Sequence, residues 1–223
     1  MKILILTALI ITTIALTAIS QTAGEYIHNP TGAIAEEFGE GNVAGIRYAE
    51  NGTVKTINGK LDKGITAVEP LDKCYEFFEL HKDLFGLVNP REELKLITAL
   101  EDPDIYKFRQ CYHEIEIARS RIDVSFNRDG SISGVSGKFF PEVRGLSTSP
   151  SISNEIAKQK AFGAYENTKS HAKPNLHSIE LIFVKDKEND RLALIWEVSI
   201  NHYRFWLDAL SGEEKGFFDV AKR

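Results

Sequence analysis

The stretch of sequence that decides the fold runs from Tyr106 to Phe140 and reads YKFRQCYHEIEIARSRIDVSFNRDGSISGVSGKFF. Apolar and polar side chains alternate along most of it, and a period of two is typical of β-strands with one buried face. Asn127-Arg128-Asp129-Gly130 interrupts the alternation with the composition of a hairpin turn. Strands joined by short turns run antiparallel, because a parallel pair needs a long crossover connection. The stretch therefore predicts an antiparallel meander.

The residues before the meander predict a hairpin followed by a helix. Two extended runs, 43–49 and 53–57, flank Glu50-Asn51-Gly52, and Asn-Gly between such runs is a strong hairpin signal because both turn positions favour positive φ. Pro70 suits the first turn of a helix, apolar residues follow it at helical spacing, and Gly86 suits the left-handed residue that ends a helix. The amount of aromatic surface on this helix indicates that it packs across a sheet.

The residues after the meander repeat this pattern. Small residues form a connector over 145–152, and Ser153 then caps a second helix. Three predicted strands follow it, at 179–184, 192–200 and 203–207. The predicted fold class is α+β, in two small cystatin-like modules that each pack an antiparallel sheet on one main helix. The predicted boundaries are a leader or linker over 21–42, a first module over 43–144, the connector and a second module over 153–223.

Composition and the first twenty residues bound the localisation. Among 223 residues, 27 are Lys or Arg and 32 are Asp or Glu, so the net charge is −5 and no nucleic-acid partner is expected. Lys2 precedes an uncharged apolar run from Ile3 to Ile19 that ends in small residues, as in a secretory signal peptide over 1–20. An uncleaved anchor is the alternative, because the run approaches the length of a membrane span. The chain is expected to be secreted, extracellular or periplasmic, with no membrane contact after cleavage.

The two cysteines are expected to form a disulfide. Cys74 and Cys111 would meet an oxidising compartment after export, where an even pair tends to bond. Two buried free thiols, packed as small apolar side chains, are the alternative. A catalytic Cys–His pair is not favoured, because Cys111 and His113 lie two residues apart on a predicted strand.

No motif in the sequence supports an enzyme. His113-Glu114 opens like the helix motif of zinc peptidases, but Ile117 stands where the second histidine is needed. Gly137-Lys138 lacks the earlier glycine and the following hydroxyl of a phosphate loop. Glu114 and Glu116 would share one side of a strand, which is more typical of a solvated stripe than of a general acid and base. No catalytic residue, metal ligand or cofactor is therefore predicted.

These residues resemble, in their order and spacing, the propeptide of thermolysin-like and fungalysin-type metallopeptidases. The resemblance covers roughly residues 43–219 and joins an FTP module to a PepSY module. Most of the motif residues are expected to be structural. They are Phe108, Arg109, Gln110, Tyr112, Asp129, Gly130 and Gly137 in the first module and Trp196, Asp208 and Gly212 in the second.

The chain departs from the family pattern at two points. The family has Gly and Pro where Glu114 and Glu116 stand, and its propeptide continues into a zinc-binding catalytic domain that this chain is expected to lack. The resemblance therefore implies binding without catalysis: the protein would act in trans on a thermolysin-like metallopeptidase, as inhibitor or folding chaperone. A secreted structural or ligand-binding module without a peptidase partner is the alternative.

Candidate contact residues follow from the same resemblance. The tail residues Phe217, Phe218 and Asp219 would enter the peptidase cleft in a substrate-like pose, and packing of this tail on its own sheet is the alternative. Arg109 lies on a central strand of the predicted meander, so we expect it to form a salt bridge inside its module instead of contacting a partner.

Overall fold

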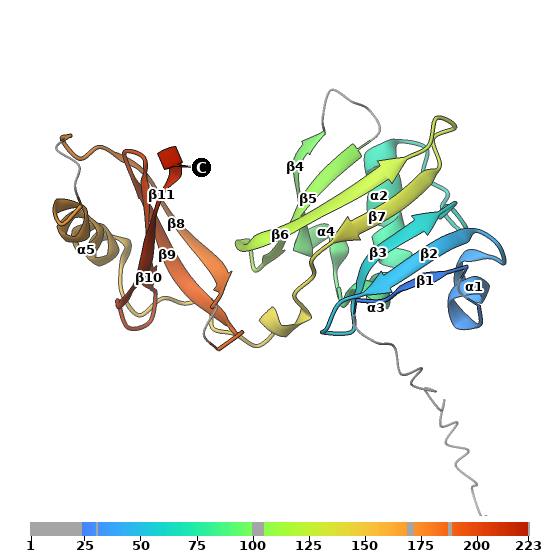
Figure 1. Ribbon diagram of the computed structural model, residues 1–223, viewed down its shortest axis with the longest axis horizontal. Helices are drawn as coiled ribbons and strands as arrows, with labels where there is room; N and C mark the ends of the chain where they lie inside the picture. The colour runs from blue at the N-terminus through green and yellow to red at the C-terminus, as the bar shows by residue number, and fades with distance from the viewer. Residues whose placement is uncertain (1–23, 30, 100–104, 169–171, 187–188, 223) are drawn as a thin grey trace, which may run out of the picture.

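The computed structural model describes residues 24–29, 31–99, 105–168, 172–186 and 189–222. The strands form one large curled sheet in the order β1-β2-β3-β7-β6-β8-β9-β10-β11, and the hairpin of β4 and β5 joins it because β5 also pairs with β6. Figure 1 shows helices at two separate places against this sheet, with α2 beside the N-terminal strands and α5 beside the C-terminal strands. The fold class is mixed α+β, as the sequence predicts.

The N-terminal half of the sheet packs on helix α2. Phe77 and Phe78 of this helix are fully buried, and the ring centroid of Phe78 lies 5.3 Å from that of Phe85 and 6.2 Å from that of Phe108. The aromatic side of the helix therefore fills the space under the meander, as expected. The elements of this half are β1 (Tyr26–His28), α1 (Ala33–Phe38), β2 (Val43–Tyr48), β3 (Val54–Gly59), α2 (Pro70–Leu80), α3 (Lys82–Phe85), α4 (Pro90–Glu93), β4 (Leu94–Ala99), β5 (Ile105–Tyr112), β6 (Ile115–Phe126) and β7 (Ile132–Gly137).

The C-terminal half of the sheet packs on helix α5. The Ser153 hydroxyl accepts a hydrogen bond from the Ile156 N–H at 3.3 Å, which confirms the predicted N-cap. The small side chains of Ala157 and Ala161 are fully buried and allow the helix to lie close to the sheet, where it meets Phe205. The elements are η1 (Pro141–Val143), α5 (Asn154–Glu166), β8 (Leu176–Lys185), β9 (Leu192–Ile200), β10 (Tyr203–Asp208), β11 (Glu214–Asp219) and η2 (Val220–Lys222).

The two predicted hairpins form, each with a three-residue loop. The Ala49 N–H donates to the Thr53 carbonyl at 2.8 Å and the Gly52 N–H donates to the Ala49 carbonyl at 3.0 Å, so three residues make the loop. In such a loop only the third residue is left-handed. Gly52 accordingly has φ 81° and Gly130, in the corresponding place of the second hairpin, has φ 77°. The expectation of positive φ at two positions of the Asn-Gly turn is therefore wrong.

A third hairpin turn lies where the sequence analysis placed a continuous strand. His113 and Glu114 have φ values of 48° and 68° and form a two-residue turn between β5 and β6. Such a turn usually contains glycine or asparagine, and neither residue is present here. Glu114 is therefore exposed at the turn and does not share a strand face with Glu116.

A short parallel contact and a small core join the two halves. Strands β6 and β8 pair in parallel at Glu116 with Ile182 and at Ile117 with Phe183. The Tyr112 hydroxyl accepts a hydrogen bond from the connector N–H of Gly145 at 3.2 Å. Because paired strands cross the predicted module boundary, the description as two cystatin-like modules is not confirmed. The buried residues around the contact are Ile117, Phe140, Val143, Phe183, Leu192, Leu194 and Ala209.

The described part of the predicted leader belongs to the fold. Strand β1 pairs with β2, and α1 places Phe38 in the first core with none of its surface exposed. The polar, glycine-rich composition of this segment hid these two short elements. The predicted signal peptide over 1–20 lies outside the described residues. Within the described residues no helix is long and apolar enough to cross a membrane.

Candidate functional site

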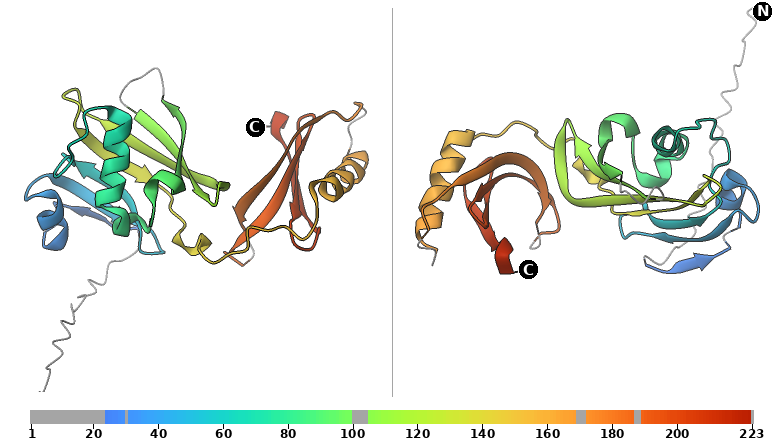
Figure 2. Two further views of the ribbon diagram at one scale, coloured as in Figure 1. Left: turned by 180° about the vertical axis from the view of Figure 1, so that it is seen from behind. Right: turned by 90° about the horizontal axis from the view of Figure 1, so that it is seen from above.

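The open face of the C-terminal half carries a groove on the side opposite α5. Successive side chains of a strand point to opposite faces, so α5 covers Val198 and Phe205 while Glu197 and Arg204 point to the open face. In the right-hand view of Figure 2 the strands curl away from α5, which lies on their outer side. The groove has a volume of about 670 Å³, and residues of β5 and β6 line it together with residues of β8 to β11.

The wall from the N-terminal half is a cluster of three charges. The Glu116 carboxylate lies 2.5 Å from the Arg109 guanidinium and 3.4 Å from the Lys95 ammonium. Burial acts to raise the pKa of Glu116, but the hydrogen bond and charge of Arg109, helped by Lys95, outweigh it and hold the pKa below its ordinary value. The predicted salt bridge of Arg109 within its own half is therefore confirmed.

The wall from the C-terminal half contains a second ion pair. The Trp206 indole N–H donates to the Glu197 carboxylate at 2.8 Å, and the Arg204 guanidinium lies 3.4 Å from the same carboxylate. The side chain of Glu197 is only 13% exposed, so these two donors fix its position. The Phe218 ring packs edge-on against Trp206, with 4.5 Å between centroids. Glu197 and Arg204 are residues that the sequence analysis did not single out.

The floor between the two walls is of mixed character, with Ile182 and Ala118 beside Ser178 and Ser199. Ile182, Val184 and Ile195 form a small buried cluster against which Ala118 and Trp206 pack. The groove thus combines charged and polar side chains with a smaller apolar surface. Groups that are already paired lose little freedom when a partner binds, and this pre-organisation favours binding.

Two charged groups that line the groove remain uncompensated. Glu180 of β8 stands directly opposite Glu197 of β9, and like charges in this position destabilise a sheet. Glu197 has Arg204 and Trp206 beside it, whereas Glu180 has no ion pair or hydrogen bond from its side chain among the described residues. Arg119 is also exposed and without a described partner, and its φ of 65° marks a kink in β6.

The motif residue Gln110 supports the junction of the two halves. Its side chain is fully buried, and its amide oxygen accepts a hydrogen bond from the Phe140 N–H at 2.8 Å. The backbone N–H of Gln110 donates to the Ser120 hydroxyl at 2.9 Å, at the point where the pairing of β5 with β6 is interrupted. The side-chain amide of Gln110 thus supplies the backbone N–H of Phe140, which follows β7, with the hydrogen-bond acceptor that a neighbouring strand would otherwise provide.

The remaining motif residues hold turns and close contacts. Asp129 accepts hydrogen bonds from the Ser131 N–H and hydroxyl, and Asp208 accepts them from the N–H groups of Leu210 and Ser211. None of these residues lines the groove. The others are Phe108 in the first core, Gly130 and Gly212 at positive φ, Gly137 against Ile122, and Trp196, whose indole N–H donates to the Ile152 carbonyl at 3.0 Å.

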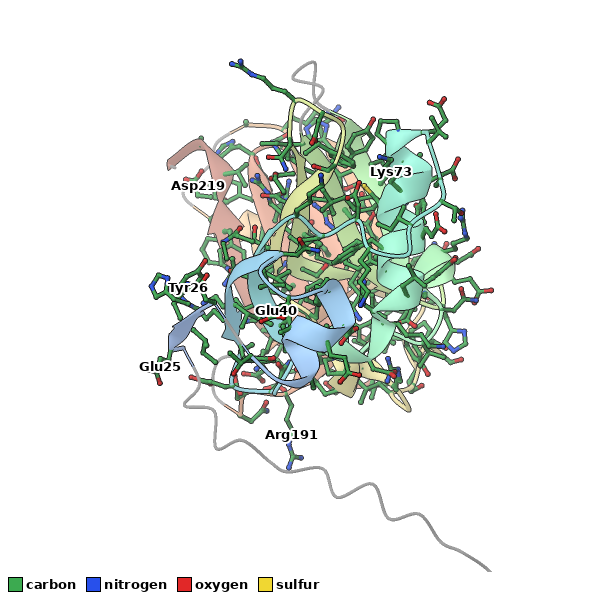
Figure 3. All side chains as sticks on the ribbon, turned by 90° about the vertical axis from the view of Figure 1, so that its right-hand side faces the viewer. Glu25, Tyr26, Glu40, Lys73, Arg191 and Asp219 are labelled. Atoms are coloured by element: carbon green, nitrogen blue, oxygen red, sulfur yellow. The ribbon has the colours of Figure 1, made fainter. Side chains whose placement is uncertain are left out.

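The predicted contact tail is part of the sheet. Phe217, Phe218 and Asp219 belong to β11, which pairs with β10 along its length. Phe217 stacks on Phe205 with 5.8 Å between ring centroids, and half of its surface is still exposed. Asp219 lies at the C-terminal edge of the sheet, where Figure 3 labels it. The alternative in which the tail packs on its own sheet describes this arrangement.

The predicted disulfide is absent. Cys74 and Cys111 are both free and buried. Cys74 lies in α2 within the first core, whereas Cys111 of β5 has the charges of Glu116, Lys95 and Arg109 near it. Both thiols nevertheless lie near Tyr75, whose pKa is raised by burial and, to a smaller extent, by both of them. Burial raises the pKa of Cys74 to about 12 and that of Cys111 to about 11, so both are protonated at neutral pH.

Comparisons with solved structures find chains that are similar to this one. No protein-family model and no curated protein sequence matches this chain. The solved C-terminal domain of YpeB from Bacillus megaterium is similar with a TM-score of 0.40 and 18% sequence identity, over 78% of this chain and 75% of that chain. The resemblance of the motifs to FTP and PepSY modules therefore stays a hypothesis.

Proposed function

We propose that this protein binds a thermolysin-like zinc metallopeptidase in trans and acts as its inhibitor, its folding chaperone or both. The proposal includes export by a signal peptide over residues 1–20 and a division into an FTP-like and a PepSY-like module of cystatin-like form. Its support from the sequence is the order and spacing of the motif residues over roughly residues 43–219.

One observation carries the binding role, namely the groove that both halves of the chain line. It holds the ion pairs of Glu116 with Arg109 and of Glu197 with Arg204 beside the apolar side chains of Ile182 and Trp206. Protein interfaces that form and dissociate are about as polar as the rest of a protein surface and contain direct hydrogen bonds, so a surface of paired charges and apolar side chains suits a protein partner. The groove is also a better contact surface than the tail, because Phe217 and Phe218 would have to leave β10 before entering a cleft.

An inhibition titration tests this function. The purified protein is added to thermolysin-like peptidases while peptidase activity and the integrity of the added chain are followed together. Inhibition at a one-to-one ratio with an intact chain supports the inhibitor role. Faster recovery of activity when a denatured peptidase refolds with the protein supports the chaperone role. Rapid cleavage with neither effect contradicts the proposal for the peptidases tested.

The alternative function is a secreted structural or ligand-binding module without a peptidase partner. The volume of the groove, about 670 Å³, favours it in one respect, because small-molecule sites have volumes of a few hundred to about a thousand Å³. Such sites are mostly apolar, whereas the rims of this groove are charged. A thermal-shift screen of small organic molecules separates the two roles, because a specific stabilising compound favours the alternative.

A further inference from the structure

Part of strand β8 has a free edge beside the groove. Strand β9 pairs with β8 from Leu176 to Lys185, but β6 pairs with it only at Ile182 and Phe183. Residues 176–181 therefore have no strand on the side of β6 among the described residues. Figure 1 shows β6 reaching one end of β8, while the rest of β8 runs away from it. An edge of this kind presents unpaired backbone N–H and C=O groups that another chain can use.

The edge also carries a charge that lacks a partner of opposite sign. Glu180 points to the groove face and stands opposite Glu197, which already has the charge of Arg204 and the indole N–H of Trp206 beside it. A strand added on the free side would place one of its side chains directly beside Glu180, at the usual distance of a cross-strand pair. A lysine or arginine at that position would remove the repulsion between the two carboxylates.

We propose that the free edge of β8 binds an extended segment of the partner protein as an added strand, with a basic side chain of that segment paired to Glu180. The inference rests on the proposed protein-binding function and specifies the segment that the protein recognises. The side chain two residues from the basic one lies on the same face, where Ser178 offers a polar contact, whereas Glu116 of β6 already occupies the place beside Ile182.

A different role for Glu180 predicts different behaviour. Charged residues on edge strands also prevent unwanted pairing between copies of a protein. If Glu180 has only this protective role, replacing it leads to self-association and leaves peptide preference unchanged. If it recognises a basic side chain, replacing it changes peptide preference while the protein stays in its original oligomeric state.

Synthetic peptides test the proposal directly. The probe is a labelled six-residue peptide of alternating threonine and valine, matched to the free residues 176–181, with lysine second from one end, and two matched peptides carry glutamine or glutamate at that position. Fluorescence anisotropy measures their binding to the purified protein. We expect the lysine peptide to bind about fivefold more tightly than the glutamine peptide, as a favourable cross-strand ion pair allows. Methylation of alternate backbone nitrogens in the lysine peptide abolishes binding if the segment adds as a strand.

Variants at Glu180 complete the test. Glu180→Gln removes the preference for lysine, and Glu180→Lys reverses it in favour of the glutamate peptide. The control Glu166→Gln changes an exposed carboxylate of α5, on the far face of the sheet, and leaves binding unchanged. Glu180→Gln also removes the repulsion with Glu197, so its urea midpoint is not lowered and weaker binding is not caused by unfolding.

The outcomes for the edge and for the peptidase function are separable. Equal binding of the three peptides, no binding at millimolar peptide, or an unchanged preference in Glu180→Gln overturns the edge proposal. Self-association of Glu180→Gln without a change of preference also overturns it and assigns the protective role. A peptidase that the wild-type protein and Glu180→Lys inhibit equally leaves the proposed function standing without this edge. Lysine-dependent peptide binding without effect on any peptidase keeps the edge and contradicts the function.

Discussion

Replacing the buried side chain of Gln110 tests whether its amide holds the junction between the two halves. Gln110→Met keeps the length of the side chain and removes both polar atoms. The Phe140 N–H, which now donates to the amide oxygen at 2.8 Å, would lose its acceptor in a buried place. The Phe140 carbonyl would lose only a weak bond of 3.5 Å. An unsatisfied buried group costs about 1–3 kcal/mol, so the loss of unfolding free energy is expected to be about 2–3 kcal/mol.

Urea unfolding measures this loss. Intrinsic fluorescence reports on Trp196 and Trp206, both in the C-terminal half, while far-ultraviolet circular dichroism reports on the whole chain. Because Phe140 belongs to the small core between the halves, we expect the two transitions to separate in Gln110→Met and to coincide in the wild type. Hydrogen exchange of the Phe140 amide should also become faster.

A matched surface variant is the control for this prediction. Gln159→Met makes the same chemical change on the exposed surface of α5 and should alter the unfolding free energy by less than about 0.5 kcal/mol. If Gln110→Met lowers the unfolding free energy as little as Gln159→Met does and its two transitions coincide, the amide of Gln110 does not hold the junction.

Three further predictions concern the thiols, an ion pair and a turn. Cys74 and Cys111 should react with a thiol reagent only after unfolding, and an intact mass lower by about two hydrogens would contradict the free thiols. The folded pKa of Glu116 lies below its ordinary value of 4.5, so its contribution to stability is present above that pH and is lost as the pH falls through the folded pKa. Glu116→Gln should therefore flatten the decline of the urea midpoint below pH 4.5, and an unchanged decline would refute this. Glu114→Gly should raise the unfolding free energy by about 0.5–1 kcal/mol, because φ is 68° there, and a lower urea midpoint would count against the turn.

The local elements could be predicted because their signals are local. The period of two in the meander, Pro70 at the start of α2, Gly86 at the end of α3 and Ser153 before α5 each act through their own neighbours in sequence. The single helix predicted between Pro70 and Gly86 is wrong in one respect, because it is divided at His81 into α2 and α3. The β5–β6 turn was missed for the same reason. His113 and Glu114 lack the glycine that marks such a turn, so only pairing of the flanking strands indicates it.

Whether Cys74 and Cys111 form a disulfide cannot be predicted from their spacing in the sequence. A count of two cysteines says that a bond is possible, but it does not say whether their side chains meet. Cys74 lies on α2 in the first core. Cys111 follows the interruption in the pairing of β5 with β6 and has the charges of Glu116, Lys95 and Arg109 near it. Both thiols lie near Tyr75 and are still free, so the number of cysteines and their spacing in the sequence do not decide this question.

The groove depends on the parallel pairing of β6 with β8, which no local sequence pattern specifies. Alternation along β8, β9 and β10 predicts that Glu180, Glu197 and Arg204 share a face once the strand register is known. The neighbouring wall with Arg109 and Glu116 joins them because β6 pairs in parallel with β8 at residues 116–117 and 182–183. That contact is very short, and the same shortness leaves residues 176–181 unpaired. The feature that brings the walls of the groove together is therefore also the one that opens the edge of β8 to a partner.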